Sequence, residues 1–109
     1  MEPQSRKRQL LLEFIDRRVF SPLLRLTEHT FIGRHRKIFR EAKKKAVHQR
    51  EDLHSYNSPL EVKEAFLKKV LYGNTRRLIV DGEEFELRMV EEPMKLRDEF
   101  IELCQTLDV

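Results

Sequence analysis

The 109-residue sequence has few of the residues on which several kinds of functional site depend. It has one cysteine, Cys104, which excludes an intrachain disulfide and a thiolate metal cage. Its three glycines are isolated, at positions 33, 73 and 82, which excludes a glycine-rich phosphate-binding loop. It has no tryptophan, no zinc-finger spacing and no aromatic-glycine signature of an RNA-binding platform.

Histidine spacing gives no support for a metal centre. None of the four histidines is three or four residues from another, so no two of them share a helix face. Cys104 is in register with apolar neighbours, where a thiol behaves as a small hydrophobic group. Since no nucleophile, acid–base pair or metal cluster stands out, we expect no cofactor and a protein that is not an enzyme.

Long apolar runs are also absent. No segment approaches the roughly 18 apolar residues of a membrane-spanning helix, and Leu10–Leu12 is too short for the core of a secretory signal. The sequence therefore predicts a cytoplasmic protein without a membrane span. Its length suits one hydrophobic core, so residues 1–109 are expected to form a single domain.

Charge, by contrast, is abundant and unevenly distributed. Charged residues make up 38% of the chain, against about 25% in typical globular domains. Residues 1–50 carry 14 Lys/Arg and 5 Asp/Glu, a net charge of +9, whereas residues 51–109 carry 8 and 14, a net charge of −6. Such a division favours either an outward basic surface that attracts polyanions or mutual attraction of the two halves, within one molecule or across a dimer.

The segment from residue 34 to about 54 concentrates this positive charge on a predicted helix. At about 100° per residue, the apolar positions fall on one side and most basic positions on the other. The apolar side consists of Ile38, Phe39, Ala42, Ala46 and Leu53. The candidate binding residues of the basic side are Arg36, Lys37, Arg40, Lys43 and Lys44.

The remaining patterns predict a predominantly helical α+β fold with four or five helices. Residues 5–20 have helical apolar spacing, and Ser58-Pro59-Leu60-Glu61 is a helix-capping sequence. Alternation on both sides of Asp81-Gly82 predicts a β-hairpin at about residues 75–90 that shares the helical core. A final helix is expected after Glu92-Pro93. Its inward side is predicted to consist of Met94, Leu96, Phe100, Leu103, Cys104 and Leu107.

Three short stretches resemble a group of small uncharacterised prokaryotic proteins. They are residues 14–23, which read Phe-Ile-Asp-Arg-Arg-Val-Phe-Ser-Pro-Leu, residues 54–58, which read His-Ser-Tyr-Asn-Ser, and residues 97–100, which read Arg-Asp-Glu-Phe. This resemblance implies no activity, partner or functional residue.

Two binding functions follow from these patterns. The first is a non-catalytic protein–protein interaction or adaptor module, including self-association as a homodimer, because the hairpin edge and the oppositely charged halves favour pairing. The alternative is nucleic-acid binding through the basic face of residues 34–54. The sequence leaves open the partner, the oligomeric state, and whether that face is exposed or paired with the acidic half.

Overall fold

The N-terminal part of the chain is one continuous helical rod. The computed structural model describes residues 3–26, 34–72, 77–80, 82–86 and 92–109. The helix α1 (Pro3–Ile15) continues through a π-helical segment, η1 (Asp16–Phe20), into the short helix α2 (Ser21–Leu24). The helix predicted over residues 5–20 is therefore confirmed. Pro22 is the second residue of α2, directly after the π-helical segment η1.

The long helix α3 (Arg34–Ser55) follows the prediction closely. All five apolar residues of its predicted inward side are buried, with exposed fractions between 0 and 4%. After a short connection, Ser58 caps α4 (Pro59–Ala65) by accepting a 3.1 Å hydrogen bond from the Glu61 amide. The chain then continues as a second π-helical segment, η3 (Phe66–Tyr72).

The last helix, α5 (Pro93–Thr106), packs against the bundle through fewer residues than the sequence predicted. Leu96, Phe100 and Cys104 are buried, at intervals of four residues, and Leu103 and Leu107 are half-buried. The inward position predicted for Met94 is wrong, since this side chain is 57% exposed. Met94 lies about 200° around the helix from Leu96, so the two side chains cannot face the same neighbour.

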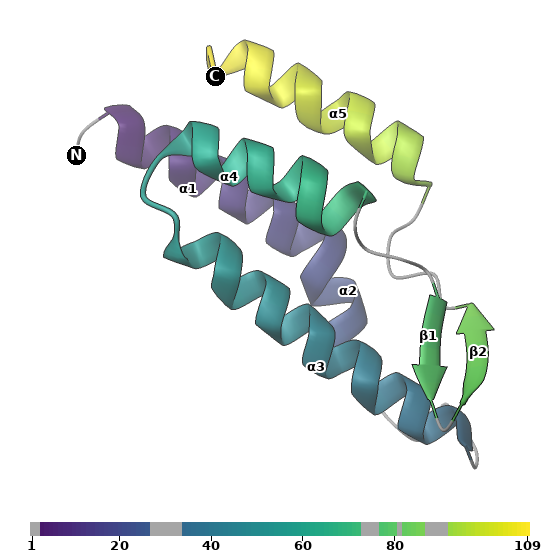
Figure 1. Cartoon of the computed structure of the whole chain (residues 1–109). Helices are drawn as coiled ribbons and strands as arrows, with labels where there is room; N and C mark the ends of the chain where they lie inside the picture. The colour runs from purple at the N-terminus through teal and green to yellow at the C-terminus, as the bar shows by residue number, and fades with distance from the viewer. Residues whose placement is uncertain (1–2, 27–33, 73–76, 81, 87–91) are drawn as a thin grey trace.

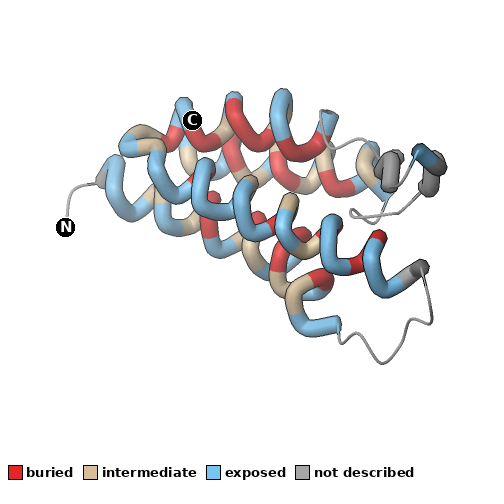
Figure 2. The backbone as a smooth tube through the Cα atoms, turned by 60° about the horizontal axis from the view of Figure 1, so that its bottom comes forward, coloured by how far each residue is buried: buried red, intermediate tan, exposed pale blue. Residues whose placement is uncertain are grey.

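The helices pack into an elongated bundle. In Figure 1, α3 runs along one side and α5 along the opposite side, with α1 and α4 between them. Figure 2 shows buried residues on the sides of the helices that face one another and exposed residues on the outer sides. Aromatic contacts join three helical segments at the centre: the ring of Phe100 lies 4.6 Å from that of Phe66 and 5.9 Å from that of Phe14.

The α+β class predicted from the sequence is wrong, because the fold is a helical bundle. Every buried hydrophobic residue that the structure describes lies on a helical segment. The helical stripes therefore cover one another and do not need a sheet as a second layer. A core shared between helices and a β-hairpin, which the α+β prediction required, is corrected accordingly.

Within the predicted hairpin range of about 75–90, only two short segments are paired. The strand β1 (Arg77–Val80) runs antiparallel to β2 (Glu83–Glu86), with Leu78 opposite Phe85. This ribbon contacts α3 at one end of the bundle (Figure 1). Residues 75, 76, 81 and 87–90 lie outside the described residues, and two four-residue strands do not make a sheet layer.

Candidate interaction surfaces

The basic stripe of α3, defined as Arg36, Lys37, Arg40, Lys43 and Lys44, lies on the side of the helix that faces away from the bundle core. Four of its five residues are exposed, and Lys43 is half-buried. The inward residues Ala42 and Ala46 are fully buried on the other side. The helix thus holds the predicted residues in one row, because basic positions three or four apart fall on one face of a helix.

Short-range contacts shape the C-terminal end of this stripe. The Lys43 ammonium lies 4.8 Å from the centre of the Phe39 ring, and the Lys44 ammonium lies 3.7 Å from a Glu41 carboxylate oxygen one turn earlier. The Lys44 side chain remains 76% exposed. An ion pair this open to water contributes little, about 0–1 kcal/mol, so Lys44 can exchange Glu41 for another anion at small cost.

A second candidate surface lies where η3 ends and α5 begins. We define this α5 patch as Tyr72, Met94 and Arg97. Tyr72 and Met94 are each 57% exposed, the largest exposed fractions among the large apolar residues that the structure describes. Arg97 donates to the Tyr72 hydroxyl through Nη1 at 3.4 Å and to Asp98 through Nη2 at 3.0 Å. The Tyr72 hydrogen bond is the main reason that the pKa of Arg97 is raised.

An open groove of about 610 Å³ continues the α5 patch along α5. Its lining is mostly acidic and consists of Glu92, Pro93, Met94, Lys95, Asp98, Glu99 and Glu102. Arg18 of η1 pairs with Glu99 at 2.6 Å and so neutralises one of these carboxylates. The groove therefore presents acidic side chains beside the exposed Tyr72 and Met94. Its residues belong to the start of α5, the helix on the opposite side of the bundle from α3 (Figure 1).

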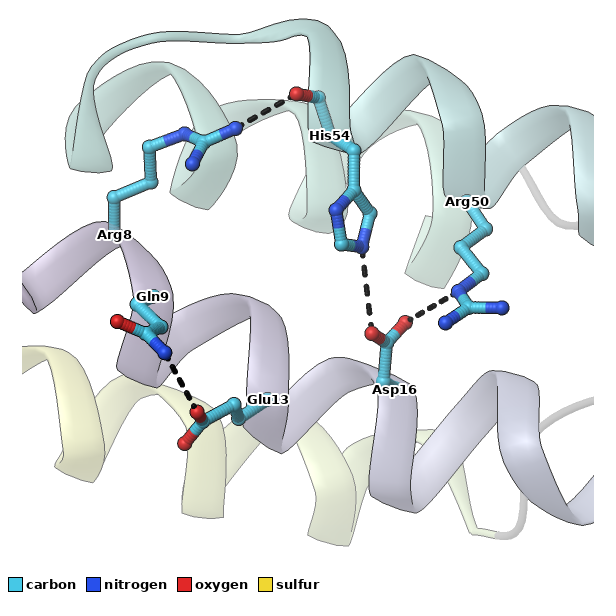
Figure 3. A network of polar contacts seen from close by, with 6 residues as sticks. All are labelled: Arg8, Gln9, Glu13, Asp16, Arg50 and His54. Atoms are coloured by element: carbon cyan, nitrogen blue, oxygen red, sulfur yellow. Dashed lines mark hydrogen bonds and ion pairs between the residues drawn. The ribbon is translucent and has the colours of Figure 1, made fainter. Parts of the chain in front are cut away.

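A third cluster joins η1 to the end of α3 (Figure 3). Asp16 contacts two side chains of α3: its Oδ1 forms an ion pair with Arg50 Nε at 3.2 Å, and its Oδ2 forms a hydrogen bond with His54 Nε2 at 3.3 Å. Arg8 of α1 donates to the backbone oxygen of His54 at 2.7 Å. Sequence reasoning missed this cluster because Asp16 and His54 are 38 residues apart and no local spacing relates them.

The contacts around Asp16 are best explained as structural, because they link η1 and α1 to the end of α3. A carboxylate that holds an imidazole can orient a general base, but catalysis also needs a nucleophile or a bound water beside that base. The contacts of His54 lead to Asp16 and, through its backbone, to Arg8. In the part of the chain that the structure describes, no group of three or more His, Cys, Asp or Glu residues could hold a metal ion.

Lys69 of η3 forms a similar structural link, through a hydrogen bond to Tyr56 and an ion pair with Asp52 of α3. Its ammonium donates to the Tyr56 hydroxyl at 2.7 Å and lies 3.7 Å from an Asp52 carboxylate oxygen. These contacts raise the pKa of Lys69, with the Tyr56 hydrogen bond as the largest cause. The acidic Asp52 near the end of α3 is therefore engaged by a cation of the C-terminal half.

Cys104 occupies the core position expected from the sequence. It is 0% exposed, and burial is the main reason that the pKa of its thiol is raised, which Lys63 partly opposes. We expect a thiol-specific reagent at pH 8 to modify the folded protein at least about 100-fold more slowly than the urea-unfolded protein, because the reactive thiolate is both scarce and inaccessible. Absorbance of the released chromophore measures both rates.

The same raised pKa sets the direction of a pH effect. Above the ordinary thiol pKa, the unfolded chain ionises at Cys104 while the folded chain holds its proton, so raising the pH favours unfolding. A Cys104→Ala variant, which no longer titrates at this position, serves as the matched control for the pH effect.

In the modification experiment, equal rates for the folded and the unfolded protein would contradict a buried Cys104 thiol.

No described helix has the length and apolar character needed to cross a bilayer. No protein-family model, curated protein or solved structure matches the chain. The resemblance of residues 14–23, 54–58 and 97–100 to small prokaryotic proteins stays a prediction.

Proposed function

We propose that the protein is a non-catalytic protein-interaction module that binds its partner through the α5 patch, and that a second copy of the chain is such a partner. The observation that carries the proposal is the exposure of Tyr72 and Met94, each 57%, beside Arg97. Tyr, Met and Arg are enriched at protein interfaces, and Tyr and Arg dominate their binding energy.

Charge favours self-association as the form of this interaction. The groove beside the α5 patch is lined by four carboxylates and one lysine, whereas the basic stripe belongs to α3, the helix on the opposite side of the bundle from α5 (Figure 1). A stripe and a groove so placed are complementary between two molecules. Contact between two different surfaces is heterologous, so it extends into rings or chains of molecules as well as dimers.

Sedimentation velocity at micromolar protein tests the proposal. We expect dimers or larger species that dissociate as salt is raised, because the opposed charges are exposed and are screened within about 10 Å at 0.1 M salt. The double substitution Tyr72→Ala/Met94→Ala should weaken association at least tenfold, since it removes both apolar anchors of the α5 patch.

Leu60 supplies the matched control. It is 53% exposed at the start of α4, at the far end of the bundle from the α5 patch (Figure 1), so Leu60→Ala should leave association unchanged. Wild-type protein that stays monomeric at both low and high salt would contradict the proposal. A Leu60→Ala variant that weakened association as much as the double substitution would place the interface elsewhere.

A further inference from the structure

We infer that Arg18 is an intramolecular competitor for the groove beside the α5 patch. In the free molecule its guanidinium occupies the Glu99 carboxylate, and a cation of the second copy takes its place there when two molecules associate. The identity of the incoming molecule rests on the proposed function, and the role of Arg18 adds how the same site is regulated. The starting observation is one contact, in which Arg18 Nη2 lies 2.6 Å from Glu99 Oε2.

The Glu99 carboxylate is incompletely satisfied by this contact. Its Oε2 atom is buried, and no donor among the described residues makes a well-directed hydrogen bond to it. The 2.6 Å approach of Arg18 is therefore a charge contact without the alignment of a hydrogen bond. A carboxylate oxygen in this state gains when a better-directed N–H reaches it, once Arg18 has moved aside.

Exchange of the cation on Glu99 costs little, because the pair is open to water. The side chains of Arg18 and Glu99 are 38% and 36% exposed, and solvent screens an ion pair of this kind. Arg18 also has a second contact, since its Cζ atom lies 5.5 Å from the centre of the Phe14 ring. The ring face still attracts the guanidinium after the carboxylate has been taken by another cation.

Arg18 also keeps the groove close to neutral in the free molecule. The lining carries four carboxylates and one lysine. Arg97 lies 3.0 Å from Asp98 and Arg18 lies beside Glu99, and these two further cations leave a net charge of −1. Removal of Arg18 would double this negative charge to −2 and so strengthen the attraction for a cation of the second copy.

The η1 segment does not depend on the contact between Arg18 and Glu99 for its position. Asp16, two residues before Arg18, contacts α3 (Figure 3), and Val19 and Phe20 are buried. Helical residues two positions apart do not share a face, so Asp16 reaches α3 while Arg18 reaches α5. We therefore expect η1 to stay packed when the guanidinium is removed.

Sedimentation velocity of Arg18→Gln tests the inference. The dissociation constant for self-association should fall about threefold to fivefold, which is the range of an exposed ion pair. The matched control is Arg17→Gln, which removes the same charge from the exposed neighbouring position of η1 and should change the constant less than about twofold. Circular dichroism checks that both variants retain the helical content of the wild type.

A double-mutant cycle with Glu99→Gln shows whether Arg18 acts through this carboxylate. In the Glu99→Gln background, Arg18→Gln should change association less than about twofold, because no carboxylate remains for it to free. An equal gain in both backgrounds would overturn the inference, since Arg18 would then act through net charge alone. Association that is unchanged or weakened by Arg18→Gln in the wild-type background would overturn it as well.

Binding of fluorescein-labelled hexalysine separates a failure of this inference from a failure of the proposed function. The assay uses the Tyr72→Ala/Met94→Ala background, in which self-association is weakened, and follows fluorescence anisotropy at low salt. Arg18→Gln should tighten hexalysine binding about threefold to fivefold, and Glu99→Gln should abolish this gain. If the gain is seen but the wild type does not self-associate, the proposed function fails and Arg18 stands as a competitor for cations at Glu99. If the wild type self-associates and Arg18→Gln gives no gain in either assay, the inference fails and the proposed function stands.

Discussion

Phe100→Ala is expected to lower the free energy of unfolding by about 3–5 kcal/mol. Phe100 is 0% exposed on α5, and its ring contacts those of Phe66 on η3 and Phe14 on α1. Truncation removes this contact from both neighbours and leaves a cavity that a close-packed core cannot fill. Since domains of this size are stable by about 5–15 kcal/mol, the change removes a large share of the total.

Urea unfolding followed by circular dichroism measures this loss. Met94→Ala is the control on the same helix, and it should cost less than about 1 kcal/mol because Met94 is 57% exposed. A double-mutant cycle with Phe66→Ala should return a coupling of about 0.5–1.5 kcal/mol for the ring pair. A loss for Phe100→Ala no larger than that for Met94→Ala would contradict α5 as part of the core.

The contacts of Phe100 explain why the fold is a helical bundle. The ring joins helical segments that are distant in sequence, and the described core contains helical residues alone. A bundle held in this way needs no sheet beneath α5. The α+β prediction failed because strand alternation shows which local structure a segment favours, whereas the class depends on which surfaces become covered by others.

Most predictions that rest on local physical chemistry were accurate, and the inward position of Met94 is the exception. Periodicity placed a helix at 34–54 against the observed Arg34–Ser55, with Phe39 and Leu53 buried as expected. The Ser58 cap was predicted correctly because its hydrogen bond to the Glu61 amide forms within one helical turn.

The contacts that the sequence could not predict are long-range. Asp16 meets His54 and Arg50 only after η1 has packed against α3, and Arg97 meets Tyr72 from a helix 25 residues further along. The surfaces proposed for binding divide in the same way. The basic stripe follows from helical spacing alone, whereas the α5 patch forms only when η3 and α5 come together.

The two fully buried alanines of α3 make the second large effect predictable. Ala42 and Ala46 are 0% exposed, so the helix lies close to its neighbours at these positions and leaves no room for a larger group. Ala46→Asp would bury a carboxylate between α3 and its neighbours, at a position where the hydrophobic core that the structure describes supplies no cation or hydrogen-bond donor to pair with it. A buried, unpaired charge of this kind costs several kcal/mol, enough to detach α3 or unfold the protein.

Val47→Asp is the matched control for this substitution. Val47 is the next residue on the same helix and is 41% exposed, so an aspartate there stays in water and should cost less than about 1 kcal/mol. Thermal unfolding by circular dichroism compares the two variants, and a shift of about 4–8 °C per kcal/mol is expected for a domain of this size. Equal losses at positions 46 and 47 would contradict the predicted division of α3 into an inward apolar side and an outward basic side.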